Sequence, residues 1–584
     1  MPQTKRWTIA EPNPLAQELA GRLKVSALVC QILINRGIEL PQDCHDFLKP
    51  SLNGLHEPSL LGGLDRASHR IAQAIRDRQK IVIYGDYDVD GITATSILWH
   101  TIRALGGEAV SYIPHRLEEG YGLNADAVTE ICDAGANLII TVDCGVTAVE
   151  PAKIAAQRGV DLIITDHHDF HGDDLPQCYA IVHPRLSDPG GQPYPNPNLC
   201  GAGVAFKLAW GIGRAMSGAT RVSESFRAIL MDATALAALG TIADVVPLTG
   251  ENRILAAHGL GGLKQSKLIG IRALIDSADL AGKKLDSYHV GFLLAPRLNA
   301  SGRMGHAKLA VEMLTDASPE RATEIALFLE QQNRQRQAIE KQILEQALQQ
   351  AIELGCDRDD CRAIVLAGRG WHAGVIGIVA SRIVERFHRP AVLIALTDGA
   401  GQGSGRSVNG FHLTKALGAC SEFLDTFGGH EMAAGLKIQE SKLEDFRRAF
   451  CQHATQTLTA DQLVPELKLE AVAEIGQLSQ ALVGDLQRLG PFGHGNRRPV
   501  LCCRDVMLTA PPRRVGKTGD HLQLFIKQGS ATMKCIAFNA GNWFDRLQTG
   551  TRLNLAAEPS LNEFNGRTSV ELQVKDLQPI TAEQ

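Results

Sequence analysis

Three aspartates in five positions follow a short apolar stretch of the chain. The stretch, IVIY at residues 81–84, is typical of a buried strand, and Asp86, Asp88 and Asp90 come directly after it. Three carboxylates in one place repel one another, and burying any of them unpaired is costly. A positive group must therefore lie among them. Lys or Arg side chains would serve, and so would a divalent cation.

Two further apolar runs end in groups of the same kind. LIITVD ends at Asp143, and LIITD ends at Asp166, which is followed by His167 and His168. Ligands of open α/β sheets gather outside the carboxyl ends of the strands. Carboxylate oxygen with some imidazole suits Mn²⁺ or Mg²⁺, and the absence of thiolate argues against a closed zinc site. Two such ions would bridge a phosphate and activate water for in-line attack.

Each of these signals has an ordinary structural explanation when it stands alone. An Asp-x-Asp sequence is usually a solvated turn, a pair of histidines is a weak signal, and Asp143 could cap a helix. Their joint occurrence at successive strand ends favours a metal site.

The elements that would position these residues alternate along the chain. Strand-like runs occupy 81–84, 109–113, 138–143, 162–166 and 179–184, and helical stretches such as 93–105, 125–134 and 147–158 lie between them. Alternation of apolar, β-branched strands with helices predicts a parallel sheet covered on both faces. The fold class is therefore α/β in this part of the chain.

The remaining segments have different patterns. Residues 14–36 include a short helical segment. Residues 318–354 read as one long helix with a polar middle at 331–337, which predicts a solvated connector. A second αβ unit follows at about 360–455. From about 466 short strands with frequent Gly, Pro and Asn predict a small β-barrel. We expect two αβ domains with mainly parallel sheets, a connector helix and a C-terminal barrel.

Composition narrows the class of protein. The 584 residues are too many for one core, and 44% hydrophobic with 21% charged residues is ordinary for a globular protein. The thirteen cysteines form no CxxC pair. No apolar run approaches membrane-spanning length, and MPQTKRWTIAEPNP lacks the apolar core of a signal peptide, so we expect a cytoplasmic protein. The net charge of −5 argues against coating of duplex DNA, although residues 497–575 hold twelve basic against six acidic residues.

Beyond these patterns, the sequence resembles the RecJ branch of the DHH phosphoesterase superfamily. GDYDVDG, TVDCG and TDHH are similar to the first motifs of the superfamily, and YIPHRLEEGYGL, GAGVAFKL, LGTIADVVPL and PRLNASGRMG to further motifs of that branch. WHAGVIGIVASRIVERFHRP, GSGRS and FGGHEMAAG resemble the associated DHHA1 domain, and PFGHGNRRPV the lead-in to an oligonucleotide-binding (OB) barrel. The resemblance implies five segments: an N-terminal cap (1–64), a DHH catalytic domain (65–316), a connector helix (317–356), a DHHA1 domain (357–460) and an OB-like domain (461–584).

The resemblance also implies roles for individual residues. Two Mn²⁺ or Mg²⁺ ions would lie among Asp86, Asp88, Asp90, Asp143, His167 and Asp244, with Asp143 bridging them. His168 would face the scissile phosphate and Asp166 would act with it; the alternative is that His168 only orients ligands. Substrate-binding residues would be Arg116, Arg303, Ser404, Arg406 and His430.

The function that the resemblance implies is metal-dependent 5′→3′ exonuclease activity on single-stranded DNA, releasing mononucleotides in recombination and repair. Two alternatives stay open: hydrolysis of oligoribonucleotides or cyclic dinucleotides, whose enzymes usually lack the basic barrel, and a catalytically inactive DNA-binding factor, which would lack metal-site aspartates. Family expectations for partners are a RecQ-type helicase and a single-strand-binding protein. We expect a monomer that does not act on membranes.

Overall fold

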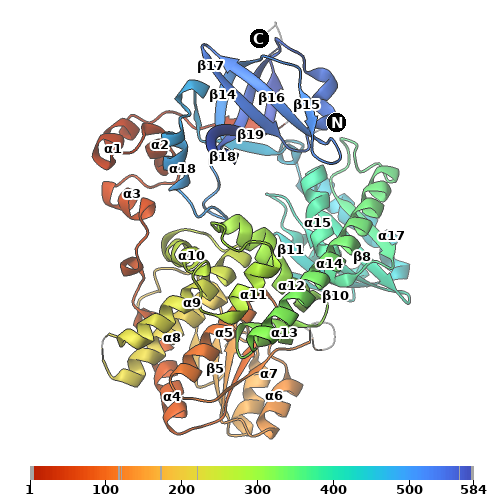
Figure 1. Cartoon of the computed structure of the whole chain (residues 1–584). Coiled ribbons are helices and arrows are strands. Elements are labelled where there is room, and N and C mark those ends of the chain that lie inside the picture. Colours follow the sequence, from red (N-terminus) through yellow and green to blue (C-terminus); the bar gives the residue numbers. More distant parts are fainter. Residues whose placement is uncertain are drawn as a thin grey trace. The chain divides into compact units, whose positions relative to one another are not determined.

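The computed structural model describes residues 5–115, 119, 122–170, 174–219, 221–564 and 566–580. Arg116, expected to bind substrate, lies outside the described residues. The chain forms two compact units: Met1–Ile9 with Gln332–Leu469, and Ala10–Gln331 with Glu470–Gln584. Figure 1 labels many of the elements of both units.

The second of these units contains the predicted parallel sheet. Its strands are β2 (Ile81–Gly85), β3 (Ala109–Tyr112), β4 (Leu138–Val142), β5 (Asp161–Thr165) and β6 (Ala180–Val182), in the order β3-β2-β4-β5-β6 and parallel throughout. The chain leaves β2 to form β3 on one side and returns to place β4 on the other. The strand order therefore reverses between β2 and β4, where ligands of such sheets bind.

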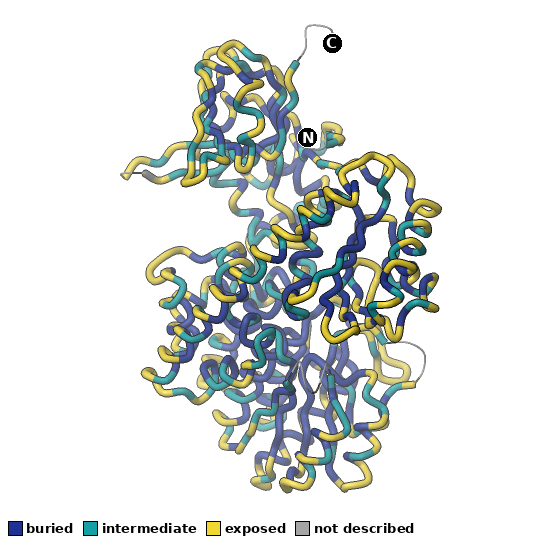
Figure 2. Tube along the Cα trace, turned by 90° about the vertical axis from the view of Figure 1, so that its right-hand side faces the viewer, coloured by how far each residue is buried: buried dark blue, intermediate teal, exposed yellow. Residues whose placement is uncertain are grey.

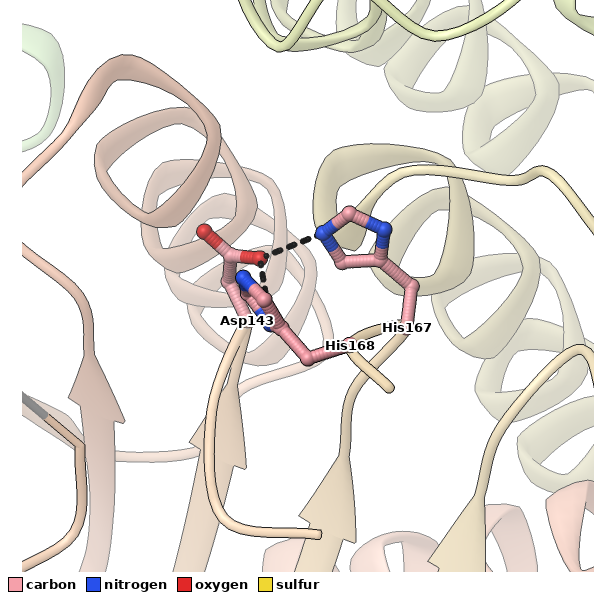
Figure 3. Close-up of side chains that lie close together, drawn as sticks. All are labelled: Asp143, His167 and His168. Atoms are coloured by element: carbon pink, nitrogen blue, oxygen red, sulfur yellow. Dashed lines mark ion pairs between the residues drawn. The ribbon is translucent and has the colours of Figure 1, made fainter. Parts of the chain in front are cut away.

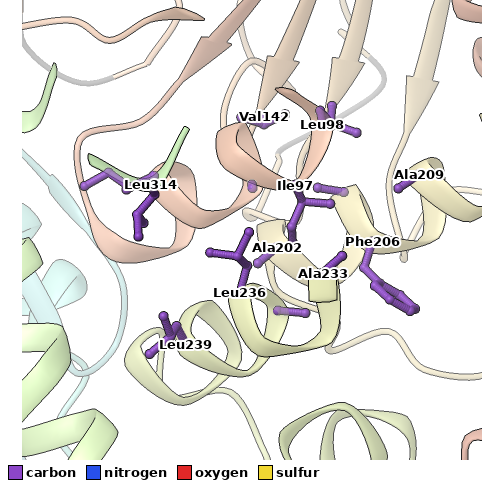
Figure 4. Packing of buried hydrophobic residues seen from close by; sticks show 14 of the residues in the cluster. Ile97, Leu98, Val142, Ala202, Phe206, Ala209, Ala233, Leu236, Leu239 and Leu314 are labelled. Carbon is purple, nitrogen blue, oxygen red and sulfur yellow. The ribbon is translucent and has the colours of Figure 1, made fainter. Parts of the chain in front are cut away.

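Helices cover both faces of this sheet, which explains why its strands are apolar without a break. Ile81 and Ile83 pack on one face with helices α4 (Leu64–Arg76), α5 (Val89–Ala104), α8 (Gly201–Ser217) and α9 (Glu224–Ala243). Val82 and Tyr84 point to the other face, against α6 (Ala125–Asp133) and α7 (Val149–Gln157). Figure 2 shows the buried strands in dark blue, and Figure 4 shows α5, α8 and α9 interlocking through side chains such as Ile97, Ala202 and Leu236.

Helix α9 contradicts the expectation that no apolar stretch approaches membrane-spanning length. It is long and apolar enough by length and composition to cross a membrane, but 61% of that apolar window is buried inside the protein. Burial of a helix on nearly all sides requires the same composition as a membrane span. We interpret α9 as a core helix.

The rest of this unit is helical up to the barrel. The predicted segment near 14–36 is two helices, α1 (Leu15–Leu23) and α2 (Ala27–Asn35), separated at Lys24, which adopts a left-handed conformation. Then come α3 (Pro41–Leu48) and, after α9, α10 (Gly250–Leu263), α11 (Ile269–Ser277), the π-helix η3 (His289–Leu294), α12 (Ala295–Arg303) and α13 (Ala307–Leu314).

The other unit holds a sheet that differs from the expected, mainly parallel arrangement. Its order is β10-β11-β9-β8-β7, from β7 (Ile364–Arg369), β8 (Ala391–Thr397), β9 (Ala400–Arg406), β10 (Thr426–Gly429) and β11 (Ala433–Gln439). Only β7 and β8 run parallel. The reason is the tight turn at Asp398 and Gly399, both at positive φ, which joins β8 to β9 as an antiparallel hairpin. Three helices pack against this sheet: α15 (Ala373–Phe387), α16 (Leu413–Ala419) and α17 (Leu443–Thr457).

The long helix is present as α14 (Pro319–Glu353), and Ser318 accepts a hydrogen bond from the amide of Arg321 at its start. The expectation of a solvated middle was wrong, because Gln332, Asn333 and Arg336 are buried. Arg336 bonds to the side chains of Asn333 (3.0 Å) and Glu340 (2.5 Å). Side-chain pairing of this kind allows polar residues to be buried, although Arg336 Nε has no hydrogen-bond partner among the described residues.

The C-terminal strands form a closed barrel, as predicted. The sheet runs β13-β14-β18-β19-β17-β16-β15, and an additional pairing of β14 with β16 closes it. The strands are β13 (Ala471–Val472), β14 (Leu501–Leu508), β15 (Arg513–Val515), β16 (His521–Gln528), β17 (Ala531–Ala537), β18 (Arg552–Phe564) and β19 (Arg567–Pro579). Helix α18 (Gln480–Gln487) packs beside β18 and β19, and Leu486 joins a core with α1 and α2. In the other unit β1 (Arg6–Ile9) pairs with β12 (Glu466–Leu469).

Candidate functional site

The three aspartates after β2 take different local roles. Helix α5 begins at Val89, earlier than predicted, so that Asp88 is its N-cap and Asp90 lies in its first turn. The Asp88 carboxylate accepts from the amides of Asp90 (2.9 Å) and Gly91 (3.2 Å). Asp86 is buried between the strand and this turn. The backbone therefore folds tightly enough to bring all three carboxylates to one strand end.

Asp90 is held by the start of a second helix. Its two carboxylate oxygens accept from the amides of Gly201 (2.5 Å) and Ala202 (2.9 Å), the first residues of α8. The N-terminus of a helix favours negative charge. Burial, with the nearby Asp88 carboxylate, nevertheless raises the pKa of Asp90 to about 6.

Asp143, at the end of β4, lies at the centre of the group. Its backbone is left-handed (φ 62°), a conformation that aspartate tolerates better than most residues. A side chain at Gly201 would come within 2.6 Å of Asp143 Cβ, so that only glycine permits this approach of α8. Burial, together with four surrounding carboxylates, raises the pKa of Asp143 well above its ordinary value.

His167 points at three carboxylates from three different elements. Its Nε2 atom lies 3.0 Å from Asp143 Oδ1 and 3.7 Å from oxygens of both Asp90 and Asp244. Figure 3 shows His167 and His168 approaching Asp143. Burial, with the charge of His168, lowers the pKa of His167 to about 3. The imidazole is therefore neutral and can offer a lone pair.

Asp244 was not visible from the strand pattern, because it caps the C-terminus of α9 and follows no strand. Only the resemblance to known motifs supplied it. Burial and the carboxylates of Asp90 and Asp88 raise the pKa of Asp244 to about 9. We call the six residues with these converging side chains the carboxylate–histidine cluster: Asp86, Asp88, Asp90, Asp143, His167 and Asp244.

The cluster fits divalent cations. Asp143 Oδ1 and His167 Nε2 are both buried and make no hydrogen bond within the described part of the chain, although they are 3.0 Å apart. Buried polar atoms without partners are costly. Potential ligand atoms lie within 4.8 Å of one another in two sets from the cluster, Asp86–Asp88–Asp143 and Asp90–His167–Asp244. Carboxylate oxygens, joined in the second set by one imidazole, suit Mn²⁺ or Mg²⁺.

Asp166 and His168 form a separate pair at the edge of the cluster. Asp166 is buried and accepts from the amides of Val146 (2.9 Å), His167 (2.7 Å) and His168 (3.1 Å), and from His168 Nδ1 (2.8 Å). Burial alone would raise the pKa of Asp166, but its bond to His168 and the amides lower it to about 2.

The same pair sets the charge of His168. Burial opposes its protonation, yet the hydrogen bond and charge of Asp166 raise the pKa of His168 to about 9. The imidazolium is partly exposed and lies 3.8 Å from Asp143. The His168 imidazolium is therefore a cation next to the cluster, and the Asp166 carboxylate holds it through a hydrogen bond.

The expected substrate-binding residues fall in two places. Arg303 ends α12, and Asn299 of the same helix accepts from the amide of Val89 (3.2 Å), so that α12 is tied to the aspartate turn. Ser404, Arg406 and His430 belong to the other unit.

In that unit the three residues gather at one end of a sheet. Arg406 Nη1 donates to Ser404 Oγ (3.2 Å) and to the carbonyl of Gly405 (2.7 Å) along β9. His430 lies in the turn between β10 and β11. Ala433, the first residue of β11, pairs with Arg406. Burial lowers the pKa of Arg406, and among the described residues no carboxylate forms an ion pair with it. A partly buried guanidinium with these neighbours suits an anion.

Three family models match successive parts of the chain. The DHH family N-terminal domain matches residues 80–241, the DHHA1 domain 360–456 and the RecJ OB domain 469–576. All three were expected from the motifs.

Relatives and solved structures match nearly the whole chain. The single-stranded-DNA-specific exonuclease RecJ of Bacillus subtilis (strain 168) is 37% identical over 574 residues, which cover 98% of this chain and 70% of that protein. The crystal structure of RecJ in complex with Mn²⁺ from Thermus thermophilus has a TM-score of 0.83 at 31% identity, over 99% of this chain and 80% of that one. The structure of RecJ in complex with Mg²⁺ from the same organism has a TM-score of 0.77 at 29% identity, over 99% and 79%.

Proposed function

Because the chain belongs to the RecJ family of single-stranded-DNA-specific exonucleases, we propose that it hydrolyses single-stranded DNA from the 5′ end and releases mononucleotides. The observation that supports the chemistry is the carboxylate–histidine cluster at the point where the strand order reverses. Recombination and DNA repair are the expected setting.

The cluster would hold two Mn²⁺ or Mg²⁺ ions, and Asp143 would contribute a ligand to both. Bound there, divalent cations polarise a phosphate and lower the pKa of a bound water. Asp143, His167 and Asp244 would supply ligand atoms, while Asp90, fixed by the amides of α8, would keep its carboxylate in one orientation. The amides at the start of α8 would thus fix the orientation of Asp90 by hydrogen bonding to its carboxylate.

His168 would act on the substrate. As an imidazolium it can donate a hydrogen bond or a proton to the charge that develops when the phosphodiester breaks. Asp166 touches His168 and three amides, so it would position the imidazolium and keep it protonated. We therefore assign Asp166 a positioning role.

The 5′ end would be recognised by guanidinium groups. Arg406 and Ser404 would bind the terminal phosphate, with His430, Arg303 and Arg116 contacting the strand. Two donors on one planar group suit phosphate oxygens. Recognition of the terminal phosphate would tie cleavage to the 5′ end and so fix the direction of digestion.

Neither alternative function accounts for all the features. Enzymes acting on short oligoribonucleotides or cyclic dinucleotides have no need of the C-terminal barrel, which matches the RecJ OB domain. A catalytically inactive DNA-binding factor would not retain the six residues of the cluster. We further propose a cytoplasmic monomer that acts with a RecQ-type helicase and a single-strand-binding protein.

Digestion of end-labelled single strands tests this proposal. With Mn²⁺, a 5′-labelled strand should release labelled mononucleotide from the first turnover, while a 3′-labelled strand shortens progressively. Duplex DNA and dinucleotides should be poor substrates. Release of label first from the 3′ end, or preference for dinucleotides, would contradict it.

A further inference from the structure

Two exposed aromatic rings lie at the start of and within the π-helix η3, which packs against α9, the helix that ends at Asp244. Tyr288 is 54% exposed and Phe292 is 65% exposed, and their rings stack with centroids 5.0 Å apart at an interplanar angle of 26°. Val245, directly after Asp244, is 62% exposed. Single exposed apolar residues are common, but a group of them at one site marks a binding surface. We call Tyr288 and Phe292 the aromatic platform.

The platform is built into elements that pack against those carrying the cluster. Phe292 lies in the π-helix η3, which packs against α9, and a side chain at Gly291 would come within 3.9 Å of Ile242, two residues before Asp244. Helix η3 continues directly into α12, where Asn299 bonds to the aspartate turn. At 1.5 Å per residue, Phe292 is about 10 Å along this helix from Asn299. Single-turn π-helices are frequent at functional sites.

Aromatic surface continues from the platform toward the barrel. Tyr288 lines a cavity of about 510 Å³ together with Phe492, Arg498 and Phe538. Arg498 lies 4.8 Å from the centre of the Phe492 ring and pairs with Asp286 (2.8 Å), and Phe538 of the barrel is 54% exposed. Flat rings beside a guanidinium are the usual composition of a surface for single-stranded nucleic acid.

We propose that the aromatic platform stacks against unpaired bases of the DNA strand as it approaches the cluster, and that it contributes to the preference for single strands. The inference rests on the proposed function. Every base has a flat π face, so stacking is tolerant of sequence. In a duplex both faces of each base are already covered by neighbouring bases, so a duplex offers the platform nothing until it is unwound.

The test combines a change in the protein with a change in the strand. Full-length wild type and Phe292→Ala are compared on a short 5′-phosphorylated strand and on the same strand with one abasic residue, moved one position at a time. Loss of one stacked base should lower kcat/KM roughly five- to a hundredfold at one or two adjacent positions. Phe292→Ala should lose as much on the intact strand and little more on the strand that is abasic at those positions.

Two further variants separate stacking from other roles. Phe292→Trp keeps a flat ring and should retain most of the wild-type kcat/KM. Val110→Ala removes another exposed apolar side chain, on β3, and should change nothing.

The outcomes distinguish this inference from the proposed function. If wild type does not digest the intact strand, the proposed function fails. If wild type digests it but Phe292→Ala loses the same factor on every strand, or loses nothing, the platform does not bind bases. Normal digestion by Phe292→Ala would leave the exposed rings as a docking surface for a protein, which also overturns the inference.

Discussion

Two clusters of charged side chains are buried in the same unit, and they are built on opposite rules. Beside α8, Lys207 pairs with Glu251, and Glu251 also accepts from the amide of His56 (2.9 Å) and the hydroxyl of Tyr194 (2.7 Å). Lys207 donates in addition to the carbonyl of His56 (2.5 Å). Charges cancel, and both charged groups have several partners.

The carboxylate–histidine cluster has the reverse character. It gathers five carboxylates around a neutral imidazole, and two buried atoms at its centre, Asp143 Oδ1 and His167 Nε2, have no hydrogen bond among the described residues. The comparison teaches that burial of charge does not by itself indicate function. A cluster whose charges pair with one another can be buried without a ligand, whereas five carboxyl groups gathered around one neutral imidazole are arranged for a cation.

The largest effect is expected from a substitution in the carboxylate–histidine cluster. Asp143→Asn keeps the shape of the side chain but removes the charge that would hold the cations. Metal ions contribute several kcal/mol to phosphoryl chemistry, so hydrolysis of single-stranded DNA should fall about a thousandfold or more. Asp133→Asn, at an exposed position on α6, is the matched control and should retain normal turnover. Near-normal activity of Asp143→Asn at saturating Mn²⁺ would remove Asp143 from the metal site.

A substitution in the Lys207–Glu251 pair should lower the stability of the protein and leave its catalytic turnover unchanged. Lys207→Met leaves the Glu251 carboxylate buried and unpaired, which should lower the free energy of unfolding by about 3–5 kcal/mol. Turnover per folded molecule should stay at the wild-type value. Denaturant unfolding and active-site-normalised kinetics measure the two separately.

A double substitution sharpens this contrast. Adding Glu251→Leu to Lys207→Met removes both charges and should recover a large part of the lost stability. Equal losses in the single and double variants would mean that packing, and not the unpaired charge, dominates at this position.

A smaller effect is expected at Arg406, which we propose binds the 5′ phosphate. A hydrogen bond to a charged group contributes about 1.5–3 kcal/mol, so Arg406→Ala should lower affinity for 5′-phosphorylated strands roughly ten- to a hundredfold. Strands with a 5′-hydroxyl should be much less affected, because they lack the terminal charge. Arg448→Ala, an exposed arginine on α17, serves as the control. Identical losses on both kinds of strand would show that Arg406 does not read the 5′ end.

Much of the first sheet could be predicted because its strands are short apolar runs that end in polar residues. All five predicted strands are present, and their carboxyl ends converge as expected. Asp244 was missed by pattern, since a residue at the end of a buried helix carries no periodic signal. The apolar pattern also could not predict that most strands of the second sheet are antiparallel, because their direction depends on the hairpin turn at Asp398 and Gly399.

Burial within long helices was the least predictable property. The middle of α14 reads as polar on every side, yet Asn333 and Arg336 are buried, because pairing between side chains replaces contact with water. The barrel also shares a core with the N-terminal helices through Leu486 and Leu489. Deletion of the barrel would therefore open that core, and single substitutions such as Phe292→Ala are cleaner probes of DNA binding.

The measurement that tests the central claim most directly is the stability of wild type and Asp143→Asn with and without Mn²⁺. Without metal, the variant should be the more stable protein at neutral pH. The raised pKa of Asp143 means that wild type must take up a proton or bury a repelled charge as it folds, and asparagine avoids that cost. With Mn²⁺ at a hundred times its Kd, wild type should gain about 2.7 kcal/mol and the variant much less, so that their order reverses. Equal stabilisation of both proteins by Mn²⁺, or a metal-free variant less stable than wild type, would contradict the assignment of the cluster as a cation site.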